Sequence, residues 1–129
     1  MNFPKELRYT KTHEWAGKKG NVVTVGISDY AQKEISDVVF VEVPKVGQVT
    51  TAGKPMAVVE SVKAAFDIYA PVSGKVTRVN AQLEAKPETV NQDCYGQGWF
   101  CEIEAADESQ WNALMPTDVY ENHVKQEVK

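Results

Sequence analysis

The sequence predicts a mainly β protein with short helices, built from two repeated units that close into a flattened antiparallel barrel or sandwich. The motif Pro-x-x-Gly-x-Val-Thr occurs at residues 44–50 and again at residues 71–77, at a constant offset of 27. Between the copies, residues 57–70 place two apolar runs around a polar tip, which is typical of a β-hairpin. One such unit cannot bury its own apolar face, so we expect the two to pack face to face with few exposed edges.

Length and composition indicate one globular domain over residues 1–129, with a core over about 20–104 and a C-terminal helical segment over about 107–125. Hydrophobic residues make up 43% and charged residues 25% of the 129 residues, which is the usual globular mixture. The net charge of −4 and the lack of a basic stripe argue against nucleic acid as a partner. No apolar run is long enough to span a bilayer, so no membrane partner is expected.

The start of the chain and its two cysteines indicate a reducing compartment, and its two histidines bear on metal binding. The chain begins at Met1 with no basic flank and apolar core of a signal peptide, which favours a bacterial cytoplasm, with a mature organellar form as the alternative. Cys94 and Cys101 fit no Cys-x-x-Cys pattern and are expected to be free thiols, Cys101 being buried. His13 and His123 are too few and too scattered for a metal site, so we expect none.

The N-terminal part is expected to form short strands. Residues 7–9 and 12–15 favour two of them, and a turn at residues 17–21 leads into a return strand at residues 22–27. In the return strand alternate residues are apolar, which predicts one buried face.

A short helix should follow that strand. Ser28 or Asp29 is expected to cap it, Asp29 with Gln32 fits a capping box, and Asp37 should end it. Residues 38–43 then form the most apolar strand of the chain, which predicts a strand that is either buried on both faces or packed inside a sandwich.

The C-terminal part mixes turns, one strand and helices. A turn-rich segment with one helical turn starting at Pro87 precedes a strand at residues 99–104. A capped helix is expected at residues 107–115. Residues 116–118 break it, and a second, weaker helical stripe leads to a frayed tail at residues 125–129.

Lys63 occupies the tip of the central hairpin. The neighbouring acids Glu60 and Asp67 favour a charged ammonium, which argues against a free-amine nucleophile, and the chain contains no other motif for catalysis. The small residues Ala64 and Ala65 leave room for a modifying enzyme. The exposed lysine is therefore either an ordinary solubilising charge or a modification target.

Several segments together resemble the H-protein family of the glycine cleavage system. The strongest is Glu-Ser-Val-Lys-Ala-Ala at residues 60–65, and the others are residues 13–15, 38–41, 67–74 and 95–99. The match extends along essentially the whole chain. The resemblance implies the lipoyl/biotinyl-type barrel-sandwich hybrid, with one helix before the core and helices at the C-terminus.

The resemblance implies a carrier without catalytic residues of its own. Lys63 would carry lipoic acid in amide linkage, with Glu60, Val62 and Ala64 as the context read by a lipoate ligase or lipoyl/octanoyl transferase. The pyridoxal-phosphate-dependent glycine decarboxylase (P protein) would load an aminomethyl group from glycine. The aminomethyltransferase (T protein) would pass it to tetrahydrofolate, and dihydrolipoyl dehydrogenase (L protein) would reoxidise the dithiol.

The resemblance also implies a cleft on the carrier that shelters the loaded arm. The matching positions are Thr12, Glu14 and Asp67, and both carboxylates suit the amine of the adduct. An ordinary exposed strand residue is the alternative for Glu14. Phe66 stands where a small residue such as serine is expected, and Glu34 is expected to face the same cleft.

Five alternatives remain at the level of sequence. A biotinyl domain usually has methionine on both sides of its lysine, whereas this chain has Val62 and Ala64. A lipoyl domain of a 2-oxo-acid dehydrogenase is normally shorter and followed by a Pro/Ala-rich linker. A relay protein that donates its lipoyl or octanoyl group to other complexes is compatible with the same residues. A lysine-dependent enzyme would have to work with Lys63 unmodified, and a structural adaptor would tolerate Lys63→Ala.

Overall fold

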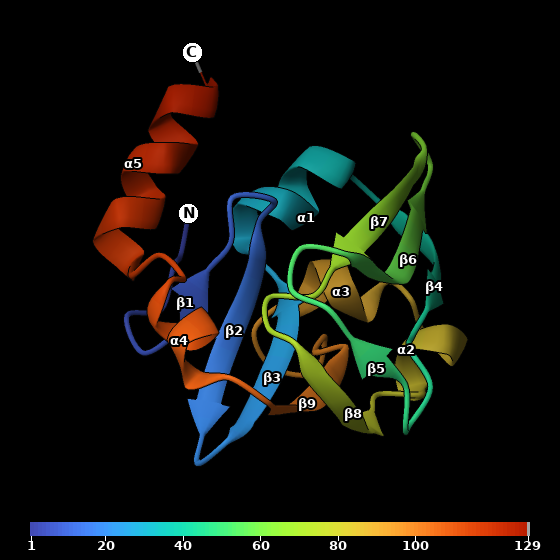
Figure 1. Ribbon diagram of the computed structural model, residues 1–129. Coiled ribbons are helices and arrows are strands. Elements are labelled where there is room, and N and C mark those ends of the chain that lie inside the picture. The colour runs from blue at the N-terminus through green and yellow to red at the C-terminus, as the bar shows by residue number, and fades with distance from the viewer. Residues whose placement is uncertain (129) are drawn as a thin grey trace.

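The computed structural model describes residues 1–128, which form two antiparallel sheets and five helices around a shared core (Figure 1). One sheet has the strand order β1-β2-β3-β9-β8-β5, and the other has the order β4-β6-β7. The strands are β1 (Arg8–Tyr9), β2 (Glu14–Lys19), β3 (Val22–Ile27), β4 (Val38–Glu42), β5 (Val49–Thr50), β6 (Pro55–Ser61), β7 (Ala65–Tyr69), β8 (Gly74–Val79) and β9 (Cys101–Ala105). The helices are α1 (Asp29–Ile35), α2 (Gln82–Ala85), α3 (Thr89–Gln92), α4 (Glu108–Asn112) and α5 (Thr117–Val128). The predicted fold class is confirmed.

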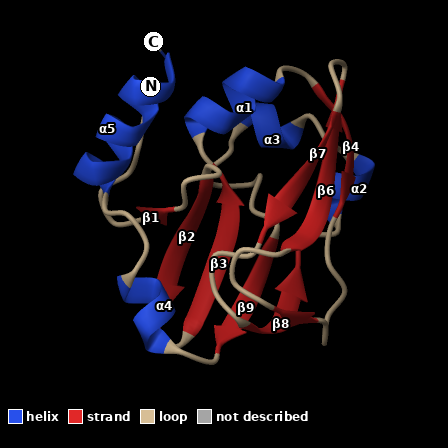
Figure 2. Cartoon of the chain, turned by 45° about the horizontal axis from the view of Figure 1, so that its top comes forward, coloured by secondary structure: helices blue, strands red, loops and turns tan. Residues whose placement is uncertain are grey.

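A single apolar core joins the two sheets. Val25 and Ile103 from the six-stranded sheet and Val59 and Ile68 from the three-stranded sheet belong to one cluster of buried side chains. Figure 2 shows the three-stranded sheet standing beside the larger one, with α1 and α3 near the β6–β7 hairpin. Burial of these side chains is the main stabilising contribution to the sandwich.

A second, aromatic cluster attaches α5 to β1 and β2. Tyr120 of α5 stacks on Tyr9 of β1, with ring centroids 4.4 Å apart and planes 8° apart. Trp15 of β2 and Val124 of α5 are buried in the same cluster. Helix α5 continues beyond this cluster to Val128, with Glu127 contacting His13, so the prediction of a frayed tail from residue 125 was wrong for the described part. Lys129 lies outside the described residues.

The first hairpin and the cap of α1 differ in detail from the prediction. Lys19 pairs with Val22, so β2 runs through most of the expected turn and only two residues connect β2 with β3. Ser28 is the N-cap of α1, and its hydroxyl accepts a hydrogen bond from the Ala31 amide. The expected capping box is absent because Gln32 instead donates its side-chain amide to Asp29 at 2.8 Å.

The prediction that β4 is buried on both faces was wrong. Val39 is 55% and Phe40 is 45% exposed, whereas Val38 and Val41 are buried. The pairing of β4 with β6 shifts register between Val38 and Phe40. This irregularity breaks the strict alternation of side chains, so two successive apolar residues lie on the outer side of the strand.

The two copies of the repeated motif lie edge to edge and not face to face, since β5 and β8 are neighbours in one sheet. Val49 of β5 pairs with Lys75 of β8, so these two side chains share one face of the sheet, and Val76, the next residue of β8, points to the opposite face. Val49 is accordingly 76% exposed, while its counterpart Val76 is 1% exposed. The two copies of the motif therefore pair with each other through their backbones, but equivalent side chains lie in different environments.

The turn residues after the two motifs also diverge. Gly53 has a φ of +81° and needs the conformational freedom of glycine. Asn80, the corresponding residue of the second copy, does not adopt positive φ; its side-chain amide donates to the carbonyl oxygens of Gln97 and Trp99 at 2.7 and 2.9 Å. Asn80 is thus a bridge between β8 and the segment before β9.

The C-terminal elements follow the prediction with shifted ends. Helix α3 contains the expected helical turn, α2 was not foreseen, and β9 begins at Cys101 instead of Trp99. Asp107 caps α4 by accepting a hydrogen bond from the Ser109 amide, as expected, although α4 already ends at Asn112. Within residues 1–128 no helix has the length and apolar character to cross a bilayer.

Candidate functional site

The tip of the β6–β7 hairpin is a short turn fixed by its own backbone. Ser61 donates its amide to the Ala64 carbonyl oxygen at 2.9 Å, and the Ser61 hydroxyl accepts from the Lys63 amide at 3.1 Å. The Val62 amide donates to the Asp37 carbonyl oxygen at 3.0 Å, which ties the tip to the segment after α1. The tip therefore presents Lys63 on a defined backbone and not on a loose loop.

The Lys63 side chain is exposed, as expected, and points toward α1. Its Nζ donates a hydrogen bond to the Glu34 carbonyl oxygen at 3.0 Å, in the last turn of that helix. The carbonyl groups at the end of a helix attract a cation, so this position suits the ammonium group. Glu60, Val62 and Ala64 are exposed around the lysine on the same hairpin.

A cleft of about 250 Å³ opens next to the Glu34 carbonyl group, between the hairpin, α1, the β1–β2 connection and α5. Its apolar lining includes Ile27, Ile35, Ile68 and Phe66. Its polar lining residues are Thr12, His13, Glu14, Glu34, Asp67 and Glu127. The structure thus brings together Thr12, Glu14 and Asp67, the three positions that the resemblance indicated. Glu34 lines the same cleft, as expected, and so does Phe66. The lysine and the cleft share Glu34 as a common border.

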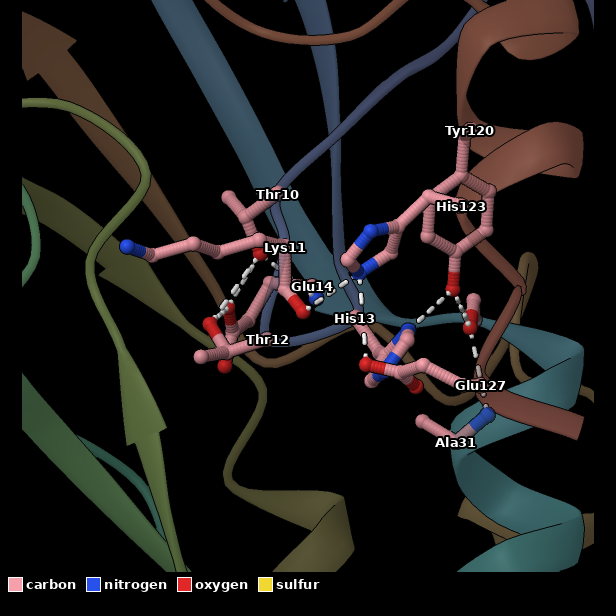
Figure 3. A network of polar contacts seen from close by, with 10 residues as sticks. Thr10, Lys11, Thr12, His13, Glu14, Ala31, Tyr120, His123 and Glu127 are labelled. Atoms are coloured by element: carbon pink, nitrogen blue, oxygen red, sulfur yellow. Dashed lines mark hydrogen bonds and ion pairs between the residues drawn. The ribbon is translucent and has the colours of Figure 1, made fainter.

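Glu14 lies in the wall of this cleft and is 1% exposed, so the alternative of an ordinary exposed strand residue was wrong. The Thr10 and Thr12 hydroxyls each lie 2.5 Å from its Oε1, and the Tyr69 amide donates to its Oε2 at 3.1 Å (Figure 3 shows the threonines). Burial raises the pKa of the Glu14 carboxyl, and the hydrogen bonds from Thr10, Thr12 and Tyr69 act in the opposite direction.

These donors leave the Glu14 carboxylate with limited capacity to accept further hydrogen bonds. Oε1 already accepts two hydrogen bonds and Oε2 accepts one, so one lone-pair direction on Oε2 remains for a ligand. Asp67 lies on the neighbouring strand β7 and is exposed. An ammonium group that enters the cleft would meet the solvated carboxylate of Asp67 and the buried carboxylate of Glu14.

The far end of the cleft is formed by residues that lie over 100 positions apart in sequence. His13 Nδ1 lies 2.7 Å from the Tyr120 hydroxyl, and His13 Nε2 lies 2.7 Å from Glu127 Oε2 (Figure 3). Burial lowers the pKa of His13, and the Glu127 carboxylate acts against this shift. The prediction that the two histidines are scattered was wrong, because the ring centroids of His13 and His123 are 5.5 Å apart.

The segment at residues 95–99 has a supporting role away from the cleft. The Tyr95 hydroxyl accepts from the Asp29 amide at 2.9 Å and donates to the Asn2 carbonyl oxygen at 2.6 Å, so it fixes the first turn of α1. Trp15 donates its indole N–H to the Cys94 carbonyl oxygen at 2.9 Å. Cys94 and Cys101 are both free thiols, as predicted, and both are buried, which was predicted for Cys101. Burial raises the pKa of each thiol to about 12.

Sequence reasoning missed four residues that shape the site: Ser61, Thr10, Tyr120 and Glu127. Thr10, Thr12 and Glu14 alternate along the chain, and this period of two could have indicated that their side chains share one face. Ser61 was quoted only as part of a motif. Tyr120 and Glu127 gave no local signal, since their partner His13 lies more than 100 positions away.

Comparisons with known proteins agree with one another. A family model described as "Glycine cleavage H-protein" matches residues 7–127. The chain is 50% identical to the glycine cleavage system H protein of Thermus thermophilus over 127 residues, covering 98% of this chain and 99% of that protein. It is 53% identical to the corresponding protein of Xanthomonas campestris over 119 residues, covering 92% and 91%.

A solved structure supports the same relationship. The crystal structure of a glycine cleavage system H protein from Mycobacterium marinum superimposes with a TM-score of 0.84 at 31% sequence identity. The superposition covers 98% of this chain and 100% of the other. The likeness therefore includes the sheets, the hairpin and the C-terminal helix together.

Proposed function

The chain belongs to the glycine cleavage H-protein family and so has the role of a carrier in the glycine cleavage system, and on that premise we propose that Lys63 carries a lipoyl group in amide linkage. Lys63 stands in the family's attachment motif at residues 60–65. The observation that carries the proposal is the position of its amine, 3.0 Å from the Glu34 carbonyl oxygen at the border of the cleft. An acyl arm attached there begins at the mouth of the cleft.

The proposed cycle uses the arm as a tether between enzymes. Glycine decarboxylase releases carbon dioxide and transfers the aminomethyl group to one sulfur of the lipoyl disulfide, which becomes reduced as the S–S bond breaks. The aminomethyltransferase passes the one-carbon unit to tetrahydrofolate and releases ammonia, leaving a dithiol. Dihydrolipoyl dehydrogenase then reoxidises the dithiol to the disulfide. A tethered substrate meets each partner at a high effective concentration, which is what the carrier contributes.

The proposed resting place of the loaded arm is the cleft. Its apolar lining suits the hydrocarbon part of the arm, and the carboxylates of Asp67 and Glu14 suit the terminal ammonium. An adduct with nitrogen and sulfur on one carbon decomposes readily when its amine leaves and water attacks. A lining that pairs the ammonium and excludes water would lengthen its lifetime.

Intact-mass measurement of the protein purified from lipoate-replete cells tests the attachment. We expect the wild-type chain to gain the mass of one lipoyl amide and Lys63→Arg to gain none. As a matched control, Lys75→Arg removes an exposed lysine from β8 and should leave the lipoyl mass in place. A wild-type chain without added mass, or a Lys63→Arg variant that still carries it, would contradict the proposal.

A further inference from the structure

Both histidines of the chain meet Glu127 at the end of the cleft. Each of His13, His123 and Glu127 offers one ligand atom, and these atoms all lie within 4.8 Å of one another. We propose that the three side chains form a binding site for a divalent transition-metal ion of the Zn²⁺ type. Nothing in the inference depends on the lipoyl group, so it stands or falls separately from the proposed function.

The local structure brings the ligand atoms close to the spacing that a metal requires. His123 and Glu127 are four residues apart on α5 and lie on one face of the helix, while His13 comes from the β1–β2 connection (Figure 3). His13 Nε2 lies 2.7 Å and His123 Nε2 lies 3.3 Å from the Glu127 carboxylate. Tetrahedral ligands at bond lengths of about 2.0–2.1 Å are separated by about 3.3 Å. Metal binding would therefore draw the three ligand atoms together from separations of up to 4.8 Å, and His123 Nε2 would exchange its contact with the Lys11 carbonyl oxygen, at 3.0 Å, for the ion.

A second observation is that a hydrogen bond at Nδ1, the ring nitrogen that does not contact Glu127, orients the His13 side chain. His13 Nδ1 lies 2.7 Å from the Tyr120 hydroxyl, which lies 2.7 Å from the Ser28 hydroxyl. This leaves Nε2 as the nitrogen that points to Glu127. A metal-bound imidazole usually donates its other N–H to such a partner, which fixes the ring and the tautomer.

The same chain of hydroxyls can serve both states of the site. In the metal-free state His13 Nε2–H donates to Glu127, so Nδ1 accepts a hydrogen bond from Tyr120. When a metal takes Nε2, the proton resides on Nδ1, which donates to the Tyr120 oxygen, and Tyr120 donates to Ser28. Since the Tyr120 hydroxyl can rotate, His13 Nδ1 keeps a hydrogen-bond partner in either tautomer.

His13 also has a φ of +78°, which a residue with a side chain adopts only at a cost. In this conformation the ring contacts Tyr30 of α1 and Tyr120 of α5. Strain of this kind persists where surrounding contacts require a particular side-chain direction, and here that direction is toward Glu127.

The donor set selects the class of metal. Two imidazole nitrogens and one carboxylate oxygen suit Zn²⁺, Co²⁺ or Ni²⁺ and do not suit Mg²⁺ or Ca²⁺, which prefer oxygen ligands alone. Three protein ligands leave at least one coordination position open. Because His13 and Glu127 both line the cleft, a bound ion would lie at its border. A bound ion would also fasten the last turn of α5 to the β1–β2 connection.

The sharpest test uses the fact that the chain contains only two histidines. The full chain, without the lipoyl group and without a histidine tag, is titrated with Zn²⁺ while its imidazole signals are followed by NMR. We expect both signals to shift together and to stop shifting at one equivalent of metal. A shift of only one imidazole signal, or of neither signal, would overturn the proposed metal site, because it would indicate that Zn²⁺ binds elsewhere or does not bind.

Variants connect the metal to the three ligands. We expect His123→Gln and Glu127→Gln to weaken Co²⁺ or Zn²⁺ binding at least tenfold, and Tyr120→Phe to weaken it about tenfold by releasing the His13 ring. Glu121→Gln is the control, because Glu121 is exposed on the same helix and is not a ligand. Far-UV circular dichroism verifies that each variant is folded. Equal affinity of wild type, His123→Gln and Glu127→Gln would refute the proposal.

Discussion

The hairpin tip and the cleft wall are neighbours that are built in opposite ways. The tip around Lys63 is exposed, comes from consecutive residues and is held by backbone hydrogen bonds within the turn and to Asp37. The wall around Glu14 is buried and is held by side chains and a backbone amide from β2, β7 and the β1–β2 connection. The tip thus exposes one lysine on a short turn, whereas the wall holds a buried carboxylate in a fixed position.

The difference predicts how each region responds to substitution. A side chain at the tip has few contacts, so its replacement should alter chemistry without altering stability. A side chain in the wall accepts several partly buried hydrogen bonds, so its replacement should alter stability and, through the shape of the cleft, the lifetime of a group bound there. Four substitutions, in order of decreasing effect on stability, examine this contrast.

The largest effect is expected for Glu14→Ala in the wall. The substitution leaves the Thr10 and Thr12 hydroxyls and the Tyr69 amide without their acceptor, at a cost of about 2–4 kcal/mol of unfolding free energy. Urea unfolding of the unlipoylated chain measures it. The lipoylated variant should also release formaldehyde and ammonia from its aminomethylated form faster than the wild type.

The matched control is Glu104→Ala, which removes an exposed carboxylate from β9. It should change the unfolding free energy by no more than about 0.5 kcal/mol. If Glu14→Ala were equally mild, Glu14 would not be part of a preorganised wall. An unchanged rate of formaldehyde and ammonia release would exclude the cleft as the shelter for the adduct.

A smaller effect is expected for Tyr120→Phe, which keeps the stacked ring and removes the hydroxyl. The Ser28 and His13 side chains each lose a partner at 2.7 Å, so we expect a loss of about 1–2 kcal/mol. Thermal unfolding with and without chelator separates this loss from any effect of bound metal. A variant as stable as the wild type would show that the end of the cleft is held by aromatic packing alone.

Ser61→Ala examines whether the tip is rigid. The substitution removes the acceptor of the Lys63 amide in a solvent-accessible turn, which should cost about 0.5–1.5 kcal/mol. Because the ligase must meet the lysine in one backbone conformation, we expect slower lipoylation in a time course with purified ligase. An unchanged rate would indicate that the turn sequence, and not its fixed shape, is what the ligase reads.

The smallest effect on stability is expected for Lys63→Arg. Lys63 is exposed and its Nζ contacts the end of α1, so the unfolding free energy should change by no more than about 0.5 kcal/mol. The same variant should lose lipoylation completely. A loss of several kcal/mol in urea unfolding would contradict the division between presentation and packing, because it would make the lysine a structural residue.

The sequence predicted the sandwich and the hairpin well because both depend on local information. Alternation in β3, the polar tip at Lys63 and the cap at Ser28 are each encoded within a few residues. It misjudged β4, where a register shift near Val39 depends on the partner strand. It also misjudged the repeat, because the register that pairs Val49 with Lys75 places Val49 and Val76 on opposite faces, and that register depends on how β5 and β8 meet.

By itself, the sequence determined the fold class, the family and the lysine that stands at the exposed turn. These follow from local pattern and from motifs at fixed spacing, and neither requires knowledge of which elements meet. Only the tertiary structure decided that Glu14 is buried under Thr10 and Thr12, and that His13, His123 and Glu127 converge. Contacts between residues more than 100 positions apart depend on the packing of α5 through its aromatic cluster, and no local pattern encodes that packing.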